Sequence, residues 1–144
     1  MKERKIKILL LEDDANDLLF IKEALKKFTS PESLLHFENG ADMLDYIFEK
    51  DNYTNKANDI IADLIILDLK TPKINGLEVL QKLKAEESTN SIPVVIFTSS
   101  NEEKDLRKSY EYGANSFIVK PIDFETFSKT IESVGNYWTN INQV

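Results

Sequence analysis

Three short apolar runs constrain the fold of this chain more than any other feature. They lie at residues 6–11, 64–67 and 92–97 and are rich in isoleucine, valine and leucine. Each run is too short for a buried helix, and a nearly continuous apolar run is typical of a strand covered on both faces. The runs therefore predict a parallel β-sheet with helices on both sides.

Amphipathic segments separate these runs. Helices are expected over residues 15–28, 41–49, 75–86, 102–112 and 124–137, from apolar residues at three- and four-residue spacing. Gly113 is a stop signal for the fourth helix and Asp123 an N-cap for the fifth. With further strands at residues 34–37 and 117–119, we expect a doubly wound α/β fold of five strands and five helices. The polar residues 50–62 predict a surface loop.

Length and charge narrow the possible functions. The 144 residues match one domain, so we expect a single domain over residues 1–144 without an output domain. The 25 acidic residues outnumber the 18 basic ones, and the net charge of -7 disfavours direct binding to nucleic acid or an anionic membrane. The chain has no cysteine, which excludes thiol chemistry. The first apolar stretch is too short for a signal peptide or membrane span, which predicts a cytoplasmic protein.

Polar residues follow the predicted strands where ligands bind in open α/β sheets. Glu12 and Asp13 follow the first strand, and Asp68 follows the third. Thr98 follows the fourth strand and Lys120 follows the fifth. Clustered carboxylates repel one another unless a cation lies among them, and Mg²⁺ prefers oxygen ligands. A carboxylate beside a lysine can attack a phosphoryl group, so this edge predicts a magnesium-dependent phosphoryl site.

This ordered set of residues resembles the receiver domains of two-component response regulators. The resemblance covers residues 5–137 and implies a CheY-like, flavodoxin-like sheet in the order 2-1-3-4-5. Several segments are similar to the stand-alone regulators paired with phytochrome-type sensor histidine kinases. These segments are Leu67-Asp68-Leu69, Pro72-Lys73, Gly76-Leu77-Glu78-Val79-Leu80, Thr98-Ser99-Ser100, Gly113-Ala114-Asn115 and Tyr137-Trp138.

The resemblance implies a role for each site residue. Asp68 would accept a phosphoryl group from a phosphohistidine of a sensor kinase, and Lys120 would contact the phosphoryl oxygens. Asp13, Asp68 and the backbone carbonyl of Lys70 would bind Mg²⁺, with Glu12 acting through water. Glu12 stands where the family usually has Asp, and its extra methylene favours such an indirect contact.

The resemblance also implies a switch. Thr98 would bond a phosphoryl oxygen and Phe117 would move inward behind it, changing the surface of the fourth helix, fifth strand and fifth helix. The family leads us to expect a cis Lys120–Pro121 bond. A homodimer contact is expected at Tyr137 and Trp138.

Other functions stay open at this point. The protein could be a terminal switch or a relay that passes phosphate to a histidine phosphotransfer protein. An aspartyl phosphohydrolase is disfavoured because no second Asp stands two positions after Asp68, where the chain has Lys70. A nucleotide carrier is disfavoured because glycine-rich phosphate loops are missing from the sequence. We therefore expect a signalling protein that is not an enzyme beyond its self-catalysed phosphoryl transfer and hydrolysis.

Two polar residues are expected to be structural. Asp14 is placed as a helix cap, and His36, the only histidine, is expected to be a strand or surface residue.

Overall fold

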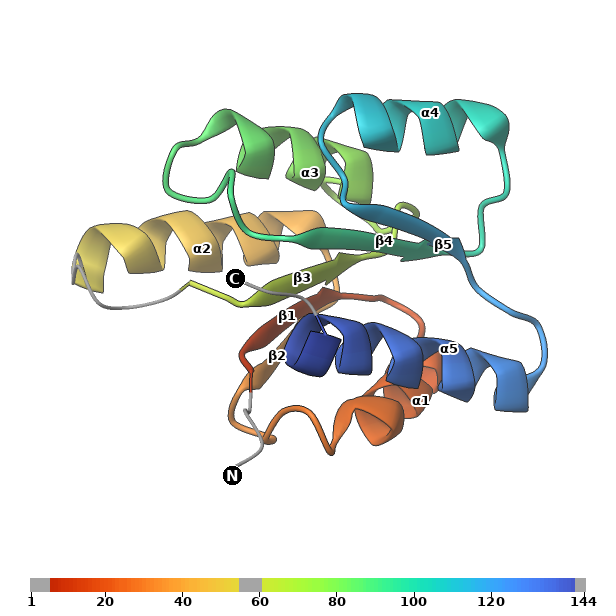
Figure 1. Ribbon diagram of the computed structural model, residues 1–144. Coiled ribbons are helices and arrows are strands. Elements are labelled where there is room, and N and C mark those ends of the chain that lie inside the picture. The colour runs from red at the N-terminus through yellow and green to blue at the C-terminus, as the bar shows by residue number, and fades with distance from the viewer. Residues whose placement is uncertain (1–5, 55–60, 142–144) are drawn as a thin grey trace.

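Five parallel strands form the centre of the structure, a computed structural model that describes residues 6–54 and 61–141 (Figure 1). The strands are β1 (Ile8–Leu11), β2 (Leu34–Phe37), β3 (Leu64–Leu67), β4 (Val94–Thr98) and β5 (Ser116–Val119). Their order is β2-β1-β3-β4-β5, and every neighbouring pair is parallel. The three apolar runs supply the central strands, which are buried along their whole length. The expected α/β fold is confirmed.

Helices cover both faces of the sheet. They are α1 (Ala15–Leu25), α2 (Gly40–Thr54), α3 (Gly76–Ala85), α4 (Glu103–Glu111) and α5 (Phe124–Asn136), the last continued by a π-helical turn, η1 (Tyr137–Ile141). In Figure 1, α1 and α5 lie together below the sheet, and α3 and α4 lie above it. Among the described residues, no helix is long and apolar enough to cross a membrane.

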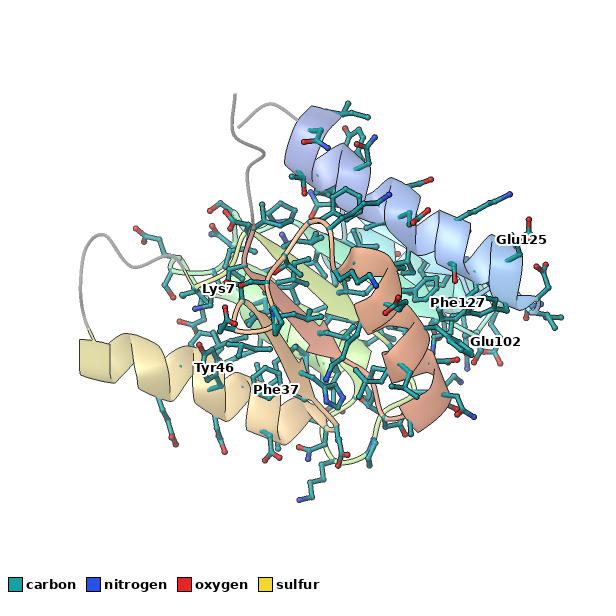
Figure 2. The ribbon with its side chains drawn as sticks, turned by 90° about the horizontal axis from the view of Figure 1, so that it is seen from below. Lys7, Phe37, Tyr46, Glu102, Glu125 and Phe127 are labelled. Carbon is teal, nitrogen blue, oxygen red and sulfur yellow. The ribbon has the colours of Figure 1, made fainter. Side chains whose placement is uncertain are left out.

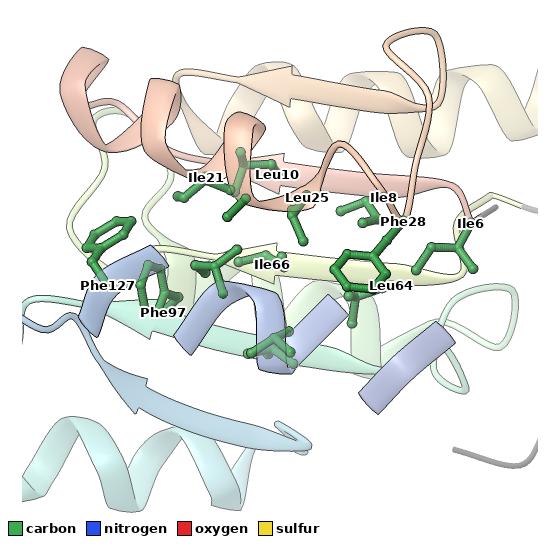
Figure 3. Close-up of a cluster of buried hydrophobic side chains, with 14 residues drawn as sticks. Ile6, Ile8, Leu10, Ile21, Leu25, Phe28, Leu64, Ile66, Phe97 and Phe127 are labelled. Atoms are coloured by element: carbon green, nitrogen blue, oxygen red, sulfur yellow. The ribbon is translucent and has the colours of Figure 1, made fainter. Parts of the chain in front are cut away.

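One hydrophobic core lies between the sheet and the pair formed by α1 and α5 (Figure 3). Leu10 reaches it from β1, and Ile21 and Leu25 reach it from α1. The rings of Phe97 and Phe127 meet edge to face, with centroids 5.1 Å apart. This contact joins the C-terminal part of β4 to the first turn of α5.

A second core lies on the opposite face, because alternate residues of a strand point to opposite sides. Leu9 of β1 packs there with Met43 of α2 and Leu80 of α3. Beside the edge strand β2, the rings of Phe37 and Tyr46 lie 5.5 Å apart, and Lys7 Nζ is 5.7 Å from the Tyr46 ring (Figure 2).

Polar side chains mark the helix boundaries. Asp14 caps α1 by accepting a hydrogen bond from the Asp17 backbone N–H at 2.9 Å, and Asp123 caps α5 in the same way through Thr126. The hydrogen bond lowers the pKa of the Asp123 carboxyl. Gly113, at φ 103°, follows the end of α4 in a conformation that favours glycine. The expected caps and stop are confirmed.

Three expectations about the backbone are wrong. Helix α2 continues to Thr54 where a loop was expected, because residues 50–54 contain no proline or glycine to end it; residues 55–60 lie outside the described residues. Helix α1 ends at Leu25, where the chain turns and Phe28 N donates to the Leu25 carbonyl. The Lys120–Pro121 peptide bond is trans, not cis, and trans is the lower-energy form by about 0.5–1 kcal/mol.

Replacing Gly76 tests how tightly α3 packs on the strand end. A Cβ atom at Gly76 would overlap the backbone carbonyl of Asp68. We expect Gly76→Ala to lower the free energy of unfolding by about 1–3 kcal/mol in urea denaturation. The control Gln81→Ala, on the exposed side of α3, should change it by less than about 0.5 kcal/mol. Equal effects would contradict this close packing.

Candidate functional site

The carboxyl ends of four strands bring the expected site residues together. Glu12 and Asp13 follow β1, and Asp68 follows β3. Thr98 is the last residue of β4, and Lys120 comes directly after β5. The central position of β1 and β3 in the sheet places their carboxylates side by side, since parallel strands end at one edge.

Lys120 is the centre of the site. Its Nζ lies 2.8 Å from oxygens of Glu12, Asp17 and Asp68. The lysine side chain is only 8% exposed, so these contacts replace the hydration of its ammonium group. Removing one partner of a buried ion pair lowers the free energy of unfolding, because the other charge is left without compensation. Lys120 has three carboxylate partners.

Asp68 is held from both of its oxygens. Oδ2 accepts from Lys120 Nζ at 2.8 Å. Oδ1 accepts from Thr98 Oγ1 at 2.9 Å and from the Lys70 backbone N–H at 3.1 Å. Asp68 and Thr98 are both buried, which fixes the carboxylate in one orientation.

Burial sets the electrostatics of the site. It raises the pKa of Glu12 to about 7, although Lys120 and the Asp14 backbone N–H partly oppose this by favouring the carboxylate. Burial alone would lower the pKa of Lys120, but its hydrogen bonds to Asp17, Asp68 and Glu12 outweigh that effect and raise it. The lysine therefore stays charged and is the fixed cation of the site.

Three carboxylates form a group that suits a metal ion. Oxygens of Glu12, Asp13 and Asp68 all lie within 4.8 Å of one another. Asp13 is exposed, whereas Glu12 and Asp68 are buried. An all-oxygen set open to solvent on one side fits a hard divalent cation that keeps some of its waters. A divalent metal site is therefore supported at this sheet edge.

Two of the expected residues are not members of this carboxylate group. The Lys70 side chain is exposed, and this residue contacts Asp68 through its backbone N–H. Phe117 lies in β5, is half-buried, and packs against the second core. Its backbone N–H donates to Tyr110 Oη at 3.1 Å.

Sequence reasoning missed Asp17. It lies in the first turn of α1, and its carboxylate reaches Lys120 across 103 positions of the chain. A signal was present, because Asp17 is four residues after Asp13, at the start of a helix that begins at the site. Such spacing is too common in helices to single out one residue.

A buried polar chain behind Thr98 was also missed. Thr98 Oγ1 accepts from the Ser100 backbone N–H at 3.3 Å, and Ser100 Oγ donates to Asp105 Oδ2 at 2.6 Å. Asp105 lies in α4, where its carbonyl accepts from Ser109 Oγ at 2.7 Å. Hydrogen bonds thus run from Asp68 to the first turns of α4.

The sequence is similar to known regulators over most of its length. A family model for the response regulator receiver domain matches residues 8–132. The probable methanogenesis regulatory protein FilR2 of Methanothrix harundinacea is 32% identical over 136 residues, covering 94% of this chain and 85% of that protein. The response regulator Rcp1 of Synechocystis sp. is 31% identical over 131 residues, covering 91% and 87%.

Solved structures give the same result. The phosphorylated cyanobacterial phytochrome response regulator RcpA has a TM-score of 0.86 at 30% identity, covering 96% of this chain and 97% of that chain. The Mn²⁺-bound form of Rcp1 has a TM-score of 0.84 at 29% identity, covering 96% and 98%.

Removing the Ser100 hydroxyl tests the buried chain behind Thr98. Ser100→Ala leaves the Asp105 carboxylate without its buried donor, so we expect a loss of about 1–3 kcal/mol in the free energy of unfolding. Ser99→Ala changes the adjacent exposed serine and should cost less than about 0.5 kcal/mol. Urea denaturation compares the two variants, and equal midpoints would show that the hydrogen bond contributes nothing.

Proposed function

Because the chain belongs to the response regulator receiver family, we propose that Asp68 accepts a phosphoryl group from a sensor histidine kinase. The receiver is homologous to the response regulator Rcp1 and to the phytochrome response regulator RcpA, and it belongs to a signalling family. The observation that carries the proposal is the setting of Asp68, a buried carboxylate with Lys120 at 2.8 Å on one oxygen and Thr98 at 2.9 Å on the other.

The chemistry follows from this setting. A carboxylate oxygen of Asp68 forms a bond to phosphorus while the P–N bond of the donor phosphohistidine breaks. The bonding pair leaves with the imidazole nitrogen, which takes up a proton. Hydrolysis later replaces the Asp68 oxygen on phosphorus by water, which releases inorganic phosphate and restores the carboxylate. Lys120 and Thr98, which contact the Asp68 carboxylate, would donate to the phosphoryl oxygens.

The acidic group has a separate part in this proposal. Mg²⁺ held by Asp13, Asp68 and the Lys70 carbonyl, with Glu12 acting through water, would neutralise charge between the carboxylates and the phosphoryl group. The oxygen ligands of the group support this choice, as does the Mn²⁺-bound form of the relative Rcp1.

The output surface is proposed from its connection to Asp68. Phosphorylation adds about -1.5 to -2 charge next to Lys120 and Thr98, which draws both toward the phosphoryl group. Phe117 then moves into the space behind Thr98, and the face formed by α4, β5 and α5 changes. Exposed apolar side chains already lie on these elements, including Leu106, Tyr110 and Val119.

The binding partners are proposed from the same similarity to known response regulators. A sensor histidine kinase is implied by the family, and similarity to RcpA supports a phytochrome-type kinase. A cytoplasmic location of this protein is consistent with the receiver family. Trp138 packs against the first core and Tyr137 is 45% exposed, so a homodimer through these residues stays a prediction. The relay and phosphohydrolase alternatives have no observation in their favour.

Replacing Asp68 tests the proposed phosphoacceptor. Incubated with acetyl phosphate and Mg²⁺, the wild type should gain one phosphoryl group by intact mass, and Asp68→Ala should gain none, because it lacks the attacking oxygen. Asp123→Asn changes an exposed aspartate and should be phosphorylated like the wild type. Equal yields for wild type and Asp68→Ala would remove Asp68 from this role.

Lys70 is expected to control the lifetime of the phosphoaspartate. Its exposed side chain lies two residues after Asp68, where it can attract and shield the phosphoryl group. We expect Lys70→Asn to speed dephosphorylation by roughly twofold to fivefold with a smaller change in Mg²⁺ affinity. Lys73→Asn, the same change at a nearby exposed lysine with φ 54°, should keep the wild-type rate. Equal decay rates for wild type and Lys70→Asn would contradict the prediction.

A further inference from the structure

The third partner of Lys120 differs from the other two in origin and surroundings. Glu12 and Asp68 come from strand ends, whereas Asp17 comes from the first turn of α1. All three contacts measure 2.8 Å. The Glu12 side chain is 1% exposed and that of Asp68 6%, but the Asp17 side chain is 25% exposed.

Three carboxylates already surround the lysine ammonium. A lysine ammonium carries three N–H donors; Nζ donates to Asp17 and Asp68, and Glu12 forms an ion pair with it at 2.8 Å. A phosphoryl group on Asp68 brings further anionic oxygens beside Nζ. These oxygens compete with the present carboxylate partners of Lys120 for its N–H donors.

Of the three carboxylates, Asp17 is the one whose contact with Lys120 costs the least free energy to break. Glu12 is buried, and among its protein partners in the described part of the chain only the Asp14 backbone N–H would remain if Lys120 moved away, which is unfavourable for a buried carboxylate. Asp68 itself carries the phosphoryl group and stays beside the lysine. Asp17 is open to water and lies in the first turn of α1, where the helix dipole favours a negative charge.

We propose that Asp17 is a positioning residue that holds Lys120 in the unphosphorylated protein and releases it to the phosphoryl group on Asp68. The inference rests on the proposed function, since it requires phosphorylation of Asp68. Asp17 and the phosphoryl oxygens compete for the same N–H donor, so the Asp17 carboxylate opposes the phosphorylated state. Release also frees one carboxylate at the start of α1, which links the state of Asp68 to that helix.

Binding of a phosphoryl mimic measures this competition. Beryllofluoride, a non-covalent mimic, is titrated into wild type and Asp17→Asn with Mg²⁺, and binding is followed by fluorine NMR. Loss of the competing charge should lower the dissociation constant by about threefold to tenfold. Asp17→Glu keeps a carboxylate on a longer side chain and should return the constant toward the wild-type value.

Asp14→Asn is the matched control. It makes the same substitution three residues earlier, and Asn caps helices as well as Asp. Among the described residues, the Asp14 side chain accepts from Asp17 N and is not a partner of Lys120. The dissociation constant of Asp14→Asn for beryllofluoride should stay within about twofold of the wild-type value. This result would separate the effect of the contact with Lys120 from that of a general loss of negative charge.

The urea midpoint, measured beside the dissociation constant, distinguishes a positioning role of Asp17 from a purely structural one. A merely structural role for Asp17 would lower the urea midpoint and leave the dissociation constant of folded protein unchanged. Asp17→Ser, which also removes the charge and suits a helix start, is the second variant if Asp17→Asn does not fold.

The outcomes separate this inference from the proposed function. If wild type neither binds beryllofluoride nor accepts phosphate on Asp68, the proposed function is wrong and the inference falls with it. If wild type binds and the neutral Asp17 variants bind equally or more weakly, only the inference is overturned. Tighter binding by these variants, without tighter binding by Asp14→Asn, supports it.

Discussion

The contacts of Lys120 are the interaction on which the site depends. A lysine that is almost fully buried must be paired, and its three carboxylates come from the first turn of α1 and from the residues that follow β1 and β3. Each of those carboxylates would in turn repel the others without the lysine. The cluster therefore holds the ends of β1, β3 and β5 in one arrangement, and the same arrangement places the Asp68 carboxylate beside a permanent cation.

The fold supports the site through close packing. The backbone at Asp68 is covered by the start of α3, where only glycine fits at position 76. On the other side, Thr98 connects Asp68 to Ser100 and Asp105, so the first turns of α4 share hydrogen bonds with the site. A change of charge at Asp68 thus acts on groups that already contact the helix of the proposed output surface.

Much of this could be predicted from sequence because it is local. The apolar runs identify β1, β3 and β4, and the polar residue after each run marks the sheet edge where ligands bind. The end of α2 was misjudged, because a polar segment without proline or glycine can continue a helix. The Lys120–Pro121 bond was misjudged because X–Pro isomers differ by only about 0.5–1 kcal/mol, so a family expectation does not decide the isomer.

The sequence by itself determined the family, the alternation of strands and helices, and the set Glu12, Asp13, Asp68, Thr98 and Lys120. These depend on residue type and on position relative to the apolar runs. Only the tertiary structure decided that Asp17 is a partner of Lys120 and that Asp105 is buried against Ser100. Both contacts depend on the direction of a helix relative to the sheet, and packing across the sheet sets that direction.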